Sequence, residues 1–271
     1  MKMRISSQTD PPLTVQQLAD FDEKGWVYLE EAFDPEAALK MQDFMWAHLK
    51  DLHGIDRQDR DTWPAVWNGL NQKGQDPIYQ DVGSPRLYAA IDQLLGKDQW
   101  HVPRGWGAFL VSPPYAEEES WTVKPRHWHW DGNPEKEVDR MNNLSVFSFY
   151  GDVQPEGGGT LLVEGSHRLI LNLMRPLGPD RGGLSKKELN RRFSKSHPWV
   201  AELTGYAPDQ GDRIRRFMEE GAVIDGVPVR VIESTGKPGD VILWHPSLYH
   251  TGSYNHKDVP RFIRNCCVRR K

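Results

Sequence analysis

Apolar residues in the first third of the chain recur with helical spacing. The pattern predicts helices over residues 14–25, 35–53 and 87–95, with a short strand at 26–29. Thr14 and Gln17 have the spacing of a capping box, which favours a helix start at that point. In the second helix one stripe is expected to face the core, and it comprises Ala38, Met41, Met45, Leu49 and Leu52.

The pattern changes near residue 100, where short apolar segments alternate with Gly, Pro and charged turns. Many short strands punctuated in this way indicate a β-sandwich or barrel. Residues 171–222 interrupt the strands with charged, partly helical sequence, and so long a connection is typical of a lid or a binding loop. We therefore expect one domain over 1–271, with a mostly helical part at 13–96 packed on a β-rich core at 100–271. The expected strands are 106–111, 126–130, 144–150, 159–163, 227–233, 240–244 and 262–268.

Charge and composition exclude several classes of protein. The 34 Lys and Arg residues are outnumbered by 38 Asp and Glu residues, which disfavours nucleic acid as a partner. The sequence has no apolar run of the ~20 residues that a membrane helix needs, and its first residues lack the apolar segment of a secretory signal. The two cysteines, Cys266 and Cys267, are adjacent, so a disulfide between them would be strained. These features predict a cytoplasmic protein without a membrane span.

The densest group of metal-binding residue types lies between Arg126 and Gly132. If this segment is extended, His129 and Asp131 point to the same side and the intervening tryptophans point to the other. A second His from elsewhere would complete the two-His, one-carboxylate triad of non-haem Fe(II) oxygenases. The His-x-Asp motif alone is also consistent with a strand whose histidines make local hydrogen bonds.

A second segment near the C-terminus provides the missing ligand type. A turn at Gly239-Asp240 precedes a buried strand, and His250 follows it. Arg261 comes eleven residues later, at the start of the next apolar segment. An arginine there can reach into a barrel and form a bidentate pair with a carboxylate, which a lysine would not replace.

With these residues in place, the sequence resembles the phytanoyl-CoA dioxygenase family of Fe(II)/2-oxoglutarate-dependent oxygenases. The resemblance covers most of the chain and is specific because several motifs occur in the same order, with the family's His-to-Arg spacing. It implies a mainly β fold with flanking α-helices, whose core is a double-stranded β-helix (a jelly-roll, cupin-like core). The motifs are the helix–strand–helix at Leu13–Leu52, the segment His129–Gly132, the turn Asp152–Thr160 leading into Glu164–Arg168, and the segment from His250 to Arg261.

Carried over by position, the resemblance assigns the metal ligands and the anchor of the co-substrate. His129, Asp131 and His250 would bind Fe(II), and Arg261 would pair with the distal carboxylate of 2-oxoglutarate. In related halogenases a small residue replaces the carboxylate and leaves a position for chloride. The presence of Asp131 therefore favours hydroxylation over halogenation.

The hydroxyl that often assists the arginine in this family is missing. The family places it two residues after the distal His, where this chain has Gly252. We expect Thr251 or Ser253 to substitute for it. Ser145 and Ser148, on the strand that follows the metal motif, are further candidates.

The resemblance thus implies a dioxygenase that uses Fe(II), 2-oxoglutarate and O₂ to oxidise a C–H bond of a small molecule, with succinate and CO₂ as co-products. A secondary metabolite or a lipid-like compound would fit as substrate, whereas the oligomeric state stays open. One alternative is a non-catalytic binding protein on the same fold. The other is a zinc hydrolase, but the metallo-β-lactamase motif expects His where this chain has Gly132.

Overall fold

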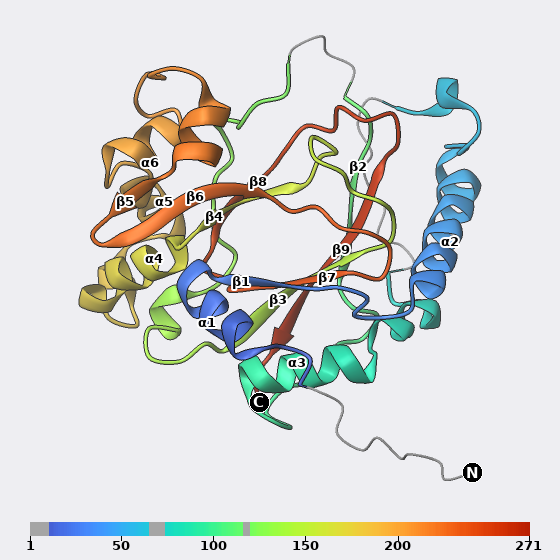
Figure 1. The fold of residues 1–271 in the computed structure, drawn as a ribbon, viewed down its shortest axis with the longest axis horizontal. Coiled ribbons are helices and arrows are strands. Elements are labelled where there is room, and N and C mark those ends of the chain that lie inside the picture. The colour runs from blue at the N-terminus through green and yellow to red at the C-terminus, as the bar shows by residue number, and fades with distance from the viewer. Residues whose placement is uncertain (1–10, 65–73, 116–119) are drawn as a thin grey trace, which may run out of the picture.

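The computed structural model describes residues 11–64, 74–115 and 120–271. Within them, two antiparallel sheets face each other (Figure 1). One has the strand order β1-β7-β3-β9-β2 and the other β5-β6-β4-β8. The strands are β1 (Trp26–Leu29), β2 (Ala108–Ser112), β3 (Asn143–Phe149), β4 (Thr160–Glu164), β5 (Ala222–Ile224), β6 (Val227–Glu233), β7 (Val241–Trp244), β8 (Tyr249–Gly252) and β9 (Arg261–Arg269).

Three N-terminal helices cover the outside of the five-stranded sheet. They are α1 (Val15–Lys24), α2 (Pro35–His53) and α3 (Pro85–Leu95). The predicted capping box at the start of α1 is present, and α2 and α3 begin after an Asp and a Ser that cap their first turns. Leu52 is 52% exposed, so including it in the core-facing stripe of α2 was wrong. It lies in the last turn of the helix, beyond the part that packs on the sheet.

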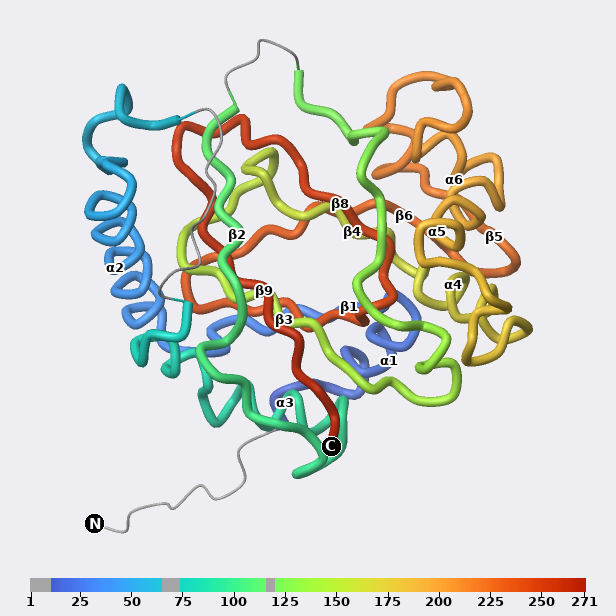
Figure 2. The backbone as a smooth tube through the Cα atoms, turned by 180° about the vertical axis from the view of Figure 1, so that it is seen from behind, coloured from blue at the N-terminus to red at the C-terminus, as the bar shows by residue number. Residues whose placement is uncertain are grey.

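The remaining helices lie beside the four-stranded sheet, at the other end of the molecule from α2 (Figure 2). They are α4 (Ser166–Met174), α5 (Lys186–Ser194) and α6 (Pro198–Leu203). Gly165 has φ +76°, and the chain turns there from β4 into α4. Short 3₁₀ helices occur at Arg60–Thr62, Pro77–Val82, Pro134–Lys136, Arg175–Leu177 and Arg181–Gly183, and a π-helical turn at Arg215–Glu220.

Side-chain alternation along the strands separates two apolar layers. In β3, Val146 belongs to the cluster that includes the N-terminal helices, whereas Phe147 and Phe149 belong to the cluster between the two sheets. In β9, Phe262 lies on the helical side and Ile263 on the inner side. The parity of a residue in these strands therefore decides whether its side chain can reach the space between the sheets.

Most of the predicted strands are present, with one informative exception. Residues 126–130 form only a single β-bridge, at His129. His127 has φ +65°, a left-handed conformation that interrupts an extended run. The strands β5 and β8 were not predicted as separate elements. Within the described part of the chain, every helix is too short or too polar to cross a membrane.

Candidate metal centre

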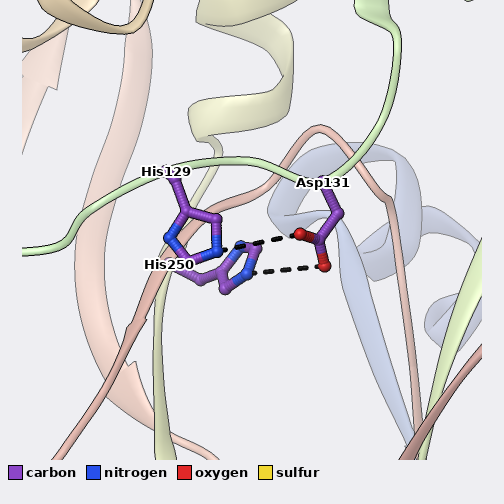
Figure 3. A group of neighbouring side chains, drawn as sticks. All are labelled: His129, Asp131 and His250. Atoms are coloured by element: carbon purple, nitrogen blue, oxygen red, sulfur yellow. Dashed lines mark ion pairs between the residues drawn. The ribbon is translucent and has the colours of Figure 1, made fainter. Parts of the chain in front are cut away.

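The structure brings together the three side chains that the sequence singled out as metal ligands. One nitrogen or oxygen atom from each of His129, Asp131 and His250 lies within 4.8 Å of the others. The Nε2 atom of His129 is 3.7 Å from Oδ1 of Asp131, and the Nε2 atom of His250 is 3.6 Å from Oδ2 of the same carboxylate (Figure 3). The two imidazoles and the carboxylate converge on one point from two different chain segments.

Backbone hydrogen bonds explain why two segments so distant in sequence meet there. His129 and His250 pair directly, with N–O distances of 3.0 and 2.8 Å in the two directions. The amides of Asp131 and Gly132 both donate to the carbonyl of Pro246. The segment with the His-x-Asp motif is thus fixed to the chain around β8 at both ligands.

The imidazoles are oriented by their other nitrogens. Nδ1 of His129 is 2.8 Å from the carbonyl oxygen of His127, and Nδ1 of His250 is 2.9 Å from that of Leu248. A carbonyl can only accept, so each Nδ1 carries the proton and each Nε2 presents its lone pair. The left-handed turn at His127 therefore orients the carbonyl that fixes the tautomer of His129.

The surroundings keep the distal imidazole neutral. Burial holds the pKa of His250 below its usual range, although the nearby Asp131 carboxylate opposes the shift. The indole of Trp244 lies edge-on to the His250 ring, with centroids 4.8 Å apart. In contrast, the side chains of His129 and Asp131 are about half exposed, at 50% and 44%. The site is thus lined by an apolar side chain beside His250 and is open to solvent beside His129 and Asp131.

The donor set fits a ferrous ion. Two neutral imidazole nitrogens and one carboxylate form the facial triad that binds non-haem Fe(II) and leaves coordination positions for other ligands. Cys266 and Cys267 are free thiols outside this group, so the described donors do not resemble a thiolate zinc site.

Arg261 begins β9 and has the same parity as Ile263, so its side chain enters the space between the sheets. It is 7% exposed. Its Nη1 donates to the carbonyl of Gly158 and lies 3.5 Å from the hydroxyl of Thr160, while Nη2 lies 3.5 Å from the carbonyl of Leu110. Burial lowers the pKa of Arg261 to about 10, and its Nε has no hydrogen-bond partner among the described residues. A buried guanidinium with spare donors is suited to receive an anion.

The expected hydroxyls at positions 251 and 253 bond to groups other than Arg261. In β8, His250 lies opposite Leu162 on the inner side, so Thr251 points to the opposite face. Ser253 follows the last residue of that strand. The hydroxyl of Thr251 donates to the carbonyl of Arg126 at 3.1 Å, and that of Ser253 donates to Glu233 at 3.2 Å. Both hydroxyls thus donate to other groups, and a role for either beside the arginine stays a prediction.

The hydroxyl beside the arginine comes instead from Thr160. Thr160 lies opposite Gly252 in the register of β4 and β8. A Cβ atom on Gly252 would meet nothing within 4 Å, so this position leaves room next to Thr160. The hydroxyl of Thr160, 3.5 Å from Nη1 of Arg261, therefore lies beside the arginine from the strand that faces Gly252. Thr160 ends the motif Asp152–Thr160 recognised in the sequence. It is two residues before Leu162 in β4, so both side chains lie on the inner side of the sheet.

The two serines of β3 lie on opposite faces of that strand. Ser145 has the parity of Phe147 and pairs with Trp244, so it faces the space between the sheets. Ser148 has the parity of Val146 and faces the helical layer, with the sheet between it and the metal ligands. Ser148 is therefore removed from the candidates, whereas Ser145 remains one.

Comparisons with known proteins agree with this geometry. The family model for phytanoyl-CoA dioxygenase matches residues 21–263. Ectoine dioxygenase from Sphingopyxis alaskensis is 23% identical over 259 residues, which cover 93% of this chain and 74% of that protein. Ava biosynthesis cluster protein O from Aspergillus versicolor is 20% identical over 260 residues, which cover 92% and 75%.

Solved structures show the same fold. The structure of EctD from S. alaskensis with bound Fe matches with a TM-score of 0.55 and 20% identity, covering 97% of this chain and 78% of that one. The α-ketoglutarate-dependent carbocyclase SnoK from nogalamycin biosynthesis matches with a TM-score of 0.54 and 16% identity, covering 96% and 84%. The predicted double-stranded β-helix is confirmed.

Fold and site together define a non-haem iron oxygenase of the double-stranded β-helix class. The chain belongs to the phytanoyl-CoA dioxygenase family, and it is an oxidoreductase of the Fe(II)- and 2-oxoglutarate-dependent dioxygenases.

Proposed function

We propose that this protein hydroxylates a C–H bond of a small molecule, with His129, Asp131 and His250 as the ligands of Fe(II). The observation that carries the proposal is the convergence of these three side chains in a fold where Arg261 also points inward. Bound Fe(II) supplies the chemistry that couples O₂ and the decarboxylation of 2-oxoglutarate, to succinate and CO₂, to oxidation of the substrate.

The chain's own residues bind and orient the reactants. The Nε2 atoms of the two histidines and the Asp131 carboxylate fix the metal on one side, and the exposed side of the triad is left for the reactants. Arg261 and Thr160 bind the distal carboxylate of 2-oxoglutarate, which sets the direction in which the keto acid points. Trp244 limits water access beside His250.

Hydroxylation is favoured because Asp131 supplies a carboxylate at the position that related halogenases leave vacant for chloride. Small molecules are favoured as substrates because the matched proteins include ectoine dioxygenase and a carbocyclase of nogalamycin biosynthesis. A secondary metabolite or a lipid-like compound stays within this proposal. We also propose that residues 171–222 form a lid over the site and that the protein is cytoplasmic.

The test is formation of succinate. Protein purified without oxygen would be supplied with Fe(II), ascorbate, 2-oxoglutarate and air, with and without a panel of small molecules. We expect succinate to form faster when one of the compounds is oxidised, and an alcohol to appear in the product mixture. The variant His250→Ala, which removes an imidazole ligand, is the control and should form none. Ester hydrolysis dependent on Zn²⁺, with no succinate, would contradict the proposal.

A further inference from the structure

Helix α5 presents three polar residues at a spacing of four, namely Lys186, Asn190 and Ser194. Residues four apart lie on the same face of a helix. Each of the three contacts a chain segment that carries a proposed metal ligand, and none of them is used by the chemistry described so far. The helix belongs to the 171–222 region, which the sequence predicted to be a lid or a binding loop.

Two of these residues bind the segment around the His-x-Asp motif. Nδ2 of Asn190 donates to the carbonyl of Trp128 at 3.0 Å, and Nζ of Lys186 donates to the carbonyl of Asp131 at 3.0 Å. The bonded carbonyls flank His129 on both sides. Because this segment is a single β-bridge and not a strand, no sheet ladder satisfies these carbonyls.

The third residue contacts the strand with the distal histidine. Ser194 Oγ donates to the carbonyl of Asn190 at 2.8 Å, so its proton is committed there. The hydroxyl of Tyr249, 2.7 Å away, therefore donates to Ser194 Oγ. Tyr249 directly precedes His250, and both hydroxyls are buried. Hydrogen bonds thus connect the Tyr249 hydroxyl, through Ser194, to the backbone of Asn190, whose side chain binds the other ligand segment.

The apolar side of α5 packs against the same two segments. The Phe193 ring is 4.9 Å from that of Tyr249 and 6.1 Å from that of Trp130, measured between centroids. Trp130 separates α5 from the ligand side, since it points away from His129 and Asp131 into the cluster around α5. The helix therefore packs against the ligand segments on the side opposite the metal-binding atoms.

We infer that α5 is a positioning element for the metal ligands, and that Asn190 is its central residue. The inference rests on the proposed function, because it assigns α5 to the same iron site. A ligand held in its bonding geometry before the metal arrives loses less conformational freedom on binding. Asn190 contributes most because its amide is partly buried, whereas the Lys186 contact is exposed to solvent and Ser194 acts through Tyr249.

The experiment measures metal affinity of the metal-free protein, with Co²⁺ added under nitrogen as a spectroscopic stand-in for Fe(II). Asn190→Leu keeps the size of the side chain and removes the donor, and we expect Co²⁺ affinity to fall about fivefold to tenfold, as for one lost hydrogen bond. Asn190→Asp should bind more weakly still, because a carboxylate would face the Trp128 carbonyl. The ligand-field spectrum of bound Co²⁺ should change in both variants.

Lys186 offers a matched set of variants on the same helix. Lys186→Met should lower Co²⁺ affinity about twofold, and Lys186→Arg, which keeps a donor, should restore it. Lys187→Met removes the same charge from the neighbouring exposed position and should leave the affinity unchanged. Because these substitutions are at exposed positions, the variant proteins are expected to fold. They therefore test the inference even if the Asn190→Leu protein does not fold.

Unfolding of the metal-free variants in urea separates positioning from general stability. If Asn190→Leu and Lys186→Met lose stability but bind Co²⁺ as tightly as the unchanged protein, with the same spectrum, the inference is wrong. Failure of the proposed function looks different. In that case the unchanged protein would bind Co²⁺ no better than His129→Ala does.

Discussion

Replacing Arg261 with Met separates the role of this guanidinium in binding 2-oxoglutarate from its role in folding. Arg261 is buried between the sheets, and its donors reach the carbonyls of Gly158 and Leu110 and the hydroxyl of Thr160. We expect the variant to bind 2-oxoglutarate about 10² to 10⁴ times more weakly, on the basis of two lost charge-assisted hydrogen bonds of roughly 1.5–3 kcal/mol each. The free energy of unfolding should change little.

The small effect on folding follows from two opposing contributions. Burial lowers the pKa of Arg261 to about 10, which corresponds to a cost of about 3 kcal/mol for the charged form in the folded protein. Removing the guanidinium relieves this cost but loses its contacts with the chain, two of them long at 3.5 Å. At about 1 kcal/mol for each contact, the two effects nearly cancel.

The assay uses two keto acids that differ by one group. Binding of 2-oxoglutarate and of 2-oxopentanoate, which lacks the distal carboxylate, is measured by calorimetry on the anaerobic Fe(II) protein. The unchanged protein should prefer 2-oxoglutarate by a factor of about 10² to 10⁴. Arg261→Met should lose the preference by binding 2-oxoglutarate as weakly as 2-oxopentanoate.

Arg264 provides the matched control, because it lies on the same strand but on the helical side, 4.0 Å from the Tyr79 ring and 4.2 Å from the Phe109 ring. Arg264→Met should lower the free energy of unfolding by about 2 kcal/mol, since it leaves buried carbonyls unpaired. Its preference for 2-oxoglutarate should persist. If Arg261→Met keeps that preference, or if Arg264→Met loses it, the assignment of the anchor is refuted.

Further predictions concern the hydroxyl of Thr160 beside Arg261 and the decrease of the free energy of unfolding at low pH. Thr160→Val should weaken 2-oxoglutarate binding about fivefold, and adding Gly252→Ser on the facing strand should restore it. Ser148→Ala should have no effect on this affinity. Equal affinities in all of these variants would contradict the placement of the hydroxyl. Burial lowers the pKa of His167 to about 4 and that of His245 to about 3, so both stay neutral in the folded protein while the unfolded chain binds protons below pH 6.5. The free energy of unfolding should therefore fall as the pH drops from about 6.5 towards 4, with a slope of about 1.4 kcal/mol per pH unit from each histidine. Urea unfolding of His167→Gln should show a shallower slope over this range, and parallel slopes would argue against the buried neutral ring.

Local signals in the sequence predicted much of the fold. The capping box at Thr14 and Gln17 and the apolar alternation of β3 and β9 are determined by neighbouring residues, so they can be recognised without tertiary information. The spacing of His129 and Asp131 indicated two of the three metal ligands, and a second histidine was needed to complete the triad. The order of motifs along the chain identified that histidine through a family resemblance.

The errors came from features that depend on partners distant in sequence. Residues 126–130 have apolar alternation, but the left-handed turn at His127 and the lack of a second partner strand prevent a ladder. The position of the Thr160 hydroxyl opposite Gly252 is visible only in the β4–β8 register. The contacts of Lys186 and Asn190 in α5 could not be predicted for the same reason, because they are made to backbone carbonyl groups, which carry no sequence signal.

The central claim is that His129, Asp131 and His250 hold one ferrous ion that also receives 2-oxoglutarate. The most direct measurement is an anaerobic titration of the Fe(II) protein with 2-oxoglutarate, followed by visible absorption. We predict a charge-transfer band that saturates at one equivalent and is absent from His129→Ala and His250→Ala. A protein that develops no band, or histidine variants that develop the same band as the unchanged protein, would contradict the account.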